Sequence, residues 1–98
     1  MADIAVHPSA QREYQAAVGW YLERSESAAG GFVGEVDRVL ARIAAQSDGY
    51  GWYDDEFREA GLRRYPYRIV YRVEPSGGVL VVAVAHASRE PGYWQGRG

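Results

Sequence analysis

The chain lacks cysteine and lysine altogether, and its longest apolar run is short. Without cysteine there is no disulfide scaffold and no thiolate metal site. The apolar run, residues 79–85, is far too short to span a bilayer, and the first residues lack the basic start and apolar stretch of a signal peptide. We therefore expect a cytoplasmic protein with no membrane association.

Because lysine is missing, every basic side chain is an arginine, whose planar fork pairs with phosphate or carboxylate but cannot serve as a tunable base. The charges are distributed unevenly. Residues 1–61 carry five arginines against eleven acidic residues, a net charge of −6, whereas residues 62–98 carry six against two, a net charge of +4. The overall charge of −2 thus hides a basic C-terminal third that could meet an anionic partner.

Periodicity in the first half predicts a strand followed by two helices. Residues 4–6 are strand-like, and apolar residues then recur at three- and four-residue steps from about residue 8 to residue 24. Ser25 can cap a second helix that ends near residue 46. A short break between two amphipathic helices predicts an antiparallel helical hairpin.

The C-terminal third predicts a three-stranded meander over residues 62–65, 67–73 and 79–86. The last strand is apolar on both faces and should be central. Ninety-eight residues, 47% of them hydrophobic, fit one domain with a modest core. The expected fold is α+β in the order β-α-α-β-β-β, with the helical hairpin packed on one face of a small, mainly antiparallel sheet.

Alternation sorts the side chains of the middle strand. Tyr67, Ile69 and Tyr71 point towards the helices, which leaves Arg68 and Arg72 on the other face. That face would be an open basic floor for an extended polyanion or an acidic peptide.

Two further stretches allow two interpretations each. Tyr93 and Trp94 should fold back over the sheet edge, although they could stack a base; the last few residues read as a frayed tail. The acidic run at residues 54–56 could bind a divalent cation, but it lacks the spacing of a calcium loop and fits a solvated loop better. We expect no metal and no cofactor.

Three segments carry a family likeness. The first opens with His7-Pro8-Ser9-Ala10, the second contains Arg64-Tyr65-Pro66-Tyr67, and the third is Ala83-Val84-Ala85-His86 followed by Arg89, Pro91, Tyr93 and Trp94. Together they resemble the RelE/ParE toxins of bacterial type II toxin-antitoxin systems, and the opening resembles the ParE-like, plasmid-stabilisation branch. The likeness covers almost the whole chain and implies a single toxin domain over residues 1–98 with the same order of elements.

The resemblance implies a toxin that a cognate antitoxin neutralises, with one of two targets. ParE-like members poison DNA gyrase and are not hydrolases, whereas RelE-like members are ribosome-dependent endoribonucleases that cut mRNA. A non-toxic protein-binding module of the same fold is a third alternative, because fold alone does not choose chemistry. We expect gyrase inhibition, since acidic residues 54–56 stand where the nucleases commonly carry lysines and the Tyr93-Trp94 ending resembles ParE-like proteins.

The resemblance also implies candidate site residues. For a nuclease they are Arg68, His86, Arg89 and Tyr93, with His86 as the general acid or base. A histidine at a strand end is, however, more often packed and hydrogen-bonded than catalytic. For antitoxin or target binding we predict an exposed apolar groove beside the hairpin, around Trp20, Phe32 and Val36. The partner-binding candidates are Trp20, Phe32, Val36, Arg64, Arg72 and Trp94.

Overall fold

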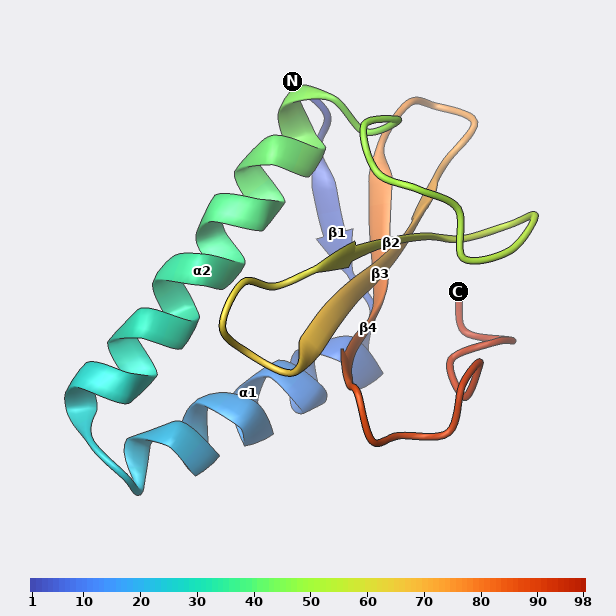
Figure 1. The fold of residues 1–98 in the computed structure, drawn as a ribbon. Coiled ribbons are helices and arrows are strands. Elements are labelled where there is room, and N and C mark those ends of the chain that lie inside the picture. The colour runs from blue at the N-terminus through green and yellow to red at the C-terminus, as the bar shows by residue number, and fades with distance from the viewer.

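The computed structural model describes residues 1–98 and has two layers, a helical hairpin and a four-stranded sheet (Figure 1). The order of elements is β-α-α-β-β-β, which confirms the expected α+β fold. Neither helix is long and apolar enough to cross a membrane. The elements are β1 (Ile4–Val6), α1 (Pro8–Leu22), α2 (Glu26–Ala45), β2 (Arg58–Gly61), β3 (Tyr67–Val73) and β4 (Val79–His86).

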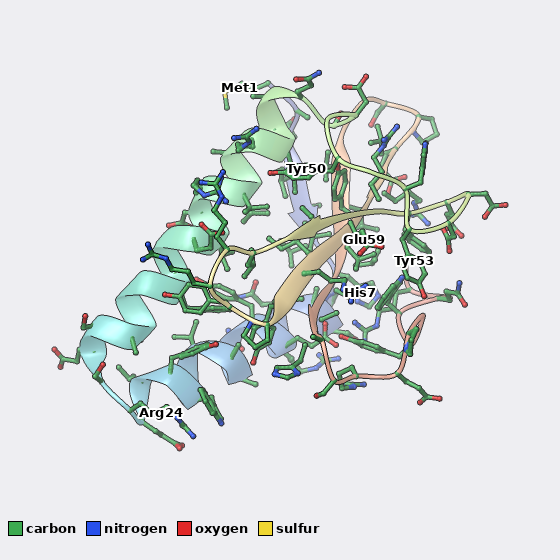
Figure 2. The ribbon with its side chains drawn as sticks, viewed as in Figure 1. Met1, His7, Arg24, Tyr50, Tyr53 and Glu59 are labelled. Atoms are coloured by element: carbon green, nitrogen blue, oxygen red, sulfur yellow. The ribbon has the colours of Figure 1, made fainter.

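Capping side chains fix where each helix begins. His7 precedes α1, and its Nδ1 atom accepts a hydrogen bond from the Ser9 backbone N–H at 3.0 Å. Ser25 precedes α2, and its hydroxyl oxygen accepts from the Ala28 backbone N–H at 2.9 Å. Each cap satisfies an N–H group that the first helical turn leaves without a partner. The predicted hairpin is confirmed, with Arg24 at the turn between its helices (Figure 2).

The sheet has the strand order β1-β4-β3-β2, so the apolar β4 is central as predicted. β1 runs parallel to β4, and the other neighbouring pairs are antiparallel. Between β3 and β4 the register shifts after Val70, which leaves Val82 as an extra residue on β4. This bulge puts Val81 and Val84 on the helix face and turns Val82 and Ala83 to the opposite face.

The predicted first strand of the meander, residues 62–65, is wrong. β2 is Arg58–Gly61, and the predicted residues lie in the turn that precedes β3. Arg64 has a φ of 69°, a left-handed conformation that ends an extended strand, and Pro66 has no N–H to donate to a ladder. Strand pairing therefore moves upstream, and the turn is free to pack Tyr65 against the helical hairpin.

Both faces of the sheet are buried. Ile69 and Tyr71 of β3 pack beneath the helices, as alternation predicts. On the opposite face Val70 packs with Phe57 and Trp94 in a second, smaller core. The C-terminal segment, red in Figure 1, lies on this side, away from α2. The expectation of an open floor is therefore wrong, because Trp94 and Phe57 cover the centre of that face.

Candidate functional site

One cleft brings together four of the predicted site residues. It lies between α1 and the C-terminal segment and encloses about 270 Å³. Trp20 comes from α1, His86 from the end of β4, and Arg89 and Tyr93 from the segment after β4. We name it the α1/C-terminal cleft. Its other polar lining residues are Glu13 and Tyr67.

Tyr93 forms one wall of this cleft. The Arg89 guanidinium lies over its ring, 3.9 Å from the centroid, while the Arg97 guanidinium lies 5.1 Å from it. The Tyr93 hydroxyl is buried without a hydrogen-bond partner. Burial, reinforced by the nearby Glu13 carboxylate, raises the pKa of Tyr93 to about 12. The phenol is therefore neutral at physiological pH and a poor proton donor.

Glu13 and Arg97 fix the C-terminal segment to α1 and to the bulge of β4. The Glu13 Oε1 atom accepts hydrogen bonds from the Val84 backbone N–H at 3.0 Å and from Arg97 Nη1 at 3.1 Å. The same Arg97 nitrogen donates to the Val82 carbonyl at 2.9 Å. The expectation of a frayed tail is wrong for this part of the chain. Sequence reasoning missed the pair, because its partners lie 84 positions apart and no local pattern joins them.

His86 is held by the turn that follows it. Its Nδ1 atom accepts a hydrogen bond from the Ser88 backbone N–H at 3.0 Å, and the Ser88 hydroxyl lies 2.7 Å from the same nitrogen. The ring also packs edge-on against Tyr67, with centroids 4.9 Å apart. A backbone amide can only donate, so the neutral imidazole carries its proton on Nε2. This geometry fits a packed, turn-forming histidine better than a catalytic one.

Arg68 and Arg72 lie outside the cleft. Arg68 Nη1 pairs with Glu59 Oε1 of the neighbouring β2 strand at 3.0 Å. Arg72 pairs with Glu56 at 3.0 Å and with Glu74 at 3.1 Å. These acidic neighbours neutralise the two arginines that were expected to form an open basic floor. Arg68 stands opposite Ala85 on the face of the sheet that the second core covers, and it is not among the residues that line the α1/C-terminal cleft.

The three residues of the predicted apolar groove, Trp20, Phe32 and Val36, do not line one recess together. Phe32 is 0% exposed and Val36 is 3% exposed, so both belong to the core. Trp20 is 49% exposed, and the Arg24 guanidinium lies 3.2 Å from its ring centroid. Trp94, also a partner-binding candidate, is only 2% exposed and serves as a core residue.

A different apolar groove lies beside the hairpin, where α1, α2 and β1 meet. It encloses about 160 Å³. We name it the interhelical groove. Val36 contributes to its floor, and Val6 at its rim is 39% exposed. Its other lining residues from these elements are Gln11, Tyr14, Asp37 and Leu40.

The acidic run at residues 54–56 forms structural contacts. The Asp54 Oδ1 atom accepts hydrogen bonds from the backbone N–H groups of Glu56 and Phe57, each at 2.8 Å, and Oδ2 accepts from Gln95 at 3.1 Å. Burial would raise the pKa of Asp54, but these hydrogen bonds to its charged form outweigh burial and lower it. No group of three or more histidine or acidic side chains in the chain is arranged to hold a metal ion. Tyr53, next to this run, packs on Trp94 beside the C-terminal segment (Figure 2).

Comparison with known proteins gives a family match and matches to solved structures. Residues 4–91 match the sequence model of the family described as "ParE toxin of type II toxin-antitoxin system, parDE". No curated protein matches the chain. Among solved structures, a chain of the "Chromosomal ParDE TA system from P. aeruginosa" aligns with a TM-score of 0.75 at 16% sequence identity, over 88% of this chain and 96% of that chain. At that identity the likeness shows a shared fold.

Proposed function

Because the chain belongs to the ParE family of toxins from type II toxin-antitoxin systems, we propose that it inhibits DNA gyrase and that a cognate antitoxin neutralises it. The choice of gyrase over mRNA rests on one observation. The four residues that a nuclease would use do not line one cleft, since Arg68 pairs with Glu59 and lies outside the α1/C-terminal cleft that holds the other three.

The chemistry of the cleft also favours binding over cleavage. Cutting RNA at a ribose 2′-hydroxyl needs a proton acceptor, a proton donor and cations for the developing charge. His86 Nδ1 already accepts from Ser88, and burial raises the pKa of Tyr93, which makes its phenol a weaker proton donor. Of the cleft residues, only Arg89 could still serve as predicted, as a cation for the developing charge. The cleft is therefore better suited to contact with another protein than to proton transfer.

We place the target-binding surface at the exposed end of α1 that adjoins the α1/C-terminal cleft. Exposed tryptophan and arginine side chains dominate the energetics of protein interfaces, and this end of α1 carries both. Trp20 is 49% exposed with Arg24 stacked on it, and Leu22 is 53% exposed. A large apolar surface beside a cation matches what a protein partner would bury.

A growth assay tests this placement. Induced expression of the chain in bacteria should stop growth, and Trp20→Ala should weaken the arrest. Trp52→Ala is the matched control, because Trp52 is 59% exposed and also has an arginine, Arg58, stacked on its ring at 3.9 Å. Equal loss of toxicity in both variants would move the target surface elsewhere. No arrest with the native chain would favour a non-toxic binding module.

We place the antitoxin contact at the interhelical groove, the apolar recess beside the hairpin. The protein encoded by the neighbouring reading frame, co-expressed with the chain, should restore growth. Val6→Glu puts a charge at the rim of the groove and should prevent that rescue while leaving toxicity intact. Val73→Glu is the control, since Val73 is also 39% exposed but does not line the groove. Rescue of the Val6→Glu chain would contradict this placement.

Ribosome-dependent mRNA cleavage is the second candidate. It is favoured by the fact that His86, Arg89 and Tyr93 share one cleft. Mapping of mRNA 5′ ends after incubation of the purified chain with translating ribosomes separates the two functions. New ends that Arg89→Ala abolishes would support cleavage, whereas an intact message would leave gyrase inhibition as the proposal.

A further inference from the structure

The turn between β2 and β3 lies beside α2 (Figure 1). The two segments enclose a polar cleft of about 350 Å³. We name it the arginine cleft. It lies apart from both the α1/C-terminal cleft and the interhelical groove, with no lining residue in common. Its lining includes Gly31, Gly34, Glu35 and Arg38 from α2 together with Arg63 and Arg64 from the turn.

The charges of the arginine cleft are not balanced within the chain. Arg38 binds both oxygens of Glu35, with Nε–Oε1 and Nη2–Oε2 distances of 2.7 and 2.9 Å. The Arg63 backbone N–H also donates to Glu35. The Glu35 carboxylate therefore has little capacity left to pair with a further guanidinium group. The guanidinium groups of Arg63 and Arg64 are exposed and make no ion pair or hydrogen bond within the chain. Three arginines against one glutamate leave a net charge of +2 in the cleft.

Arg64 is also held in an unfavourable backbone conformation. Its φ is 69°, in the left-handed region that glycine adopts freely and that residues with a Cβ atom adopt at a cost in free energy. Its guanidinium makes no polar contact within the chain that would offset this cost. Strained backbone positions cluster at binding sites, and Arg64 lines the cleft.

Glycines keep the α2 side of the cleft open. Gly31 has a structural reason, because a Cβ atom there would lie 2.5 Å from the Tyr65 hydroxyl oxygen. Gly34 has none, since a Cβ atom there would meet nothing within 4 Å. Glycine in a helix interior is destabilising relative to alanine. Because Gly34 has no side chain, the space next to Arg38 in the cleft stays unfilled.

We propose that the arginine cleft binds a carboxylate side chain on an acidic segment of a partner protein. Guanidinium groups pair with carboxylates through two parallel hydrogen bonds, and Arg63 and Arg64 have all of theirs available. A nucleic acid fits less well, because backbone phosphates need an extended basic surface and this chain carries a net charge of −2. A recess of about 350 Å³ suits one or two side chains.

This assignment goes beyond the proposed function, because it concerns a separate surface and requires neither gyrase nor toxicity. Under the proposed function the natural source of the acidic segment is the antitoxin. An electrostatic contact of this kind would speed encounter between the two proteins and fix their register.

The test uses the purified full chain and a short synthetic peptide that carries two glutamates, followed by nuclear magnetic resonance. The peptide should shift the backbone amide signals of Gly31, Gly34 and Arg63 to Tyr65. Arg63→Gln and Arg64→Gln should each weaken binding by roughly tenfold, as loss of a charge-assisted hydrogen bond predicts. Arg12→Gln, a substitution at an exposed arginine of α1, should leave the affinity unchanged.

A second variant separates binding from folding. Arg64→Gly should raise the melting temperature, because glycine relieves the left-handed strain, and should still lose peptide binding. The proposal would be overturned by equal binding of a peptide with glutamine in place of glutamate, by an equal effect of Arg12→Gln, or by a DNA duplex binding the same residues more tightly. Each result is independent of any gyrase or growth assay, so failure here and failure of the proposed function are distinguishable.

Discussion

The Nδ1 atom of His86 accepts a hydrogen bond from the Ser88 backbone N–H at 3.0 Å, which makes this histidine part of a turn. We predict that His86→Gln lowers the free energy of unfolding by about 1 kcal/mol, the typical net contribution of one hydrogen bond. Growth inhibition by the variant should persist. Urea denaturation and the growth assay check both parts, and loss of toxicity in a variant that is still folded would return His86 to a functional role.

Trp94 should be the most destabilising position of the C-terminal segment. It is 2% exposed and packs with Phe57 and Val70 in the second core. Trp94→Ala should cost about 3–5 kcal/mol of unfolding free energy, measured by urea denaturation, because it removes a large side chain and leaves a cavity. Trp94→Phe should cost clearly less, since the indole N–H makes no hydrogen bond that would be lost. Similar values for the two variants would contradict this packing.

Glu13 and Arg97 should be energetically coupled. Their side chains are 15% and 20% exposed and lie 3.1 Å apart. A double-mutant cycle with Glu13→Gln and Arg97→Gln should give a coupling energy of about 1–2 kcal/mol, more than an exposed pair provides. A coupling energy near zero would mean that the C-terminal segment is not held by this pair in solution.

Ionisation of Glu35 should make the stability of the fold depend on pH in the acidic range. Its ion pair with Arg38, helped by the Arg63 backbone N–H, lowers the pKa of Glu35 from 4.5 to about 2. A carboxyl group whose pKa is lower in the folded state stabilises the fold above its unfolded pKa, and this contribution disappears as the pH falls towards the folded pKa. Stability should therefore drop between about pH 5 and pH 2.

Solvent screening of the partly exposed Arg38 guanidinium reduces the contribution of this pair to stability. Unfolding curves recorded across that pH range give the slope of the unfolding free energy against pH. Glu35→Gln should remove the contribution of Glu35 to the pH dependence of stability completely, and Arg38→Gln should remove most of it, because the Arg63 backbone N–H still donates to Glu35. An unchanged slope in both variants would contradict the assignment to this ion pair.

Much of the fold could be predicted because its signals are local. Apolar residues at helical spacing predicted both helices, Ser25 marked the start of the second, and alternation along β3 placed Ile69 and Tyr71 beneath the helices. The position of β2 could not be predicted. It depends on the left-handed conformation of Arg64. Glycine or asparagine in a sequence would indicate such a conformation, but arginine does not.

The candidate site was harder to predict, because it depends on contacts between distant parts of the chain. Arg68 and Arg72 looked available from alternation alone, but Glu59 and Glu56 pair with them from another strand and a loop. The sequence predicted that Phe32 is exposed and binds a partner. In the structure the turn after β2 packs Tyr65 against Phe32, with ring centroids 5.5 Å apart. Sequence spacing carries no information on such pairings.

Inhibition of gyrase is the central claim, and a supercoiling assay with purified components tests it most directly. Relaxed plasmid, DNA gyrase, ATP and the purified chain are combined, and supercoiled and cleaved DNA are separated on a gel. We predict that the native chain blocks supercoiling and traps cleaved complexes, that Trp20→Ala weakens the effect, and that Arg68→Ala does not. Full supercoiling in the presence of excess native chain would contradict the claim.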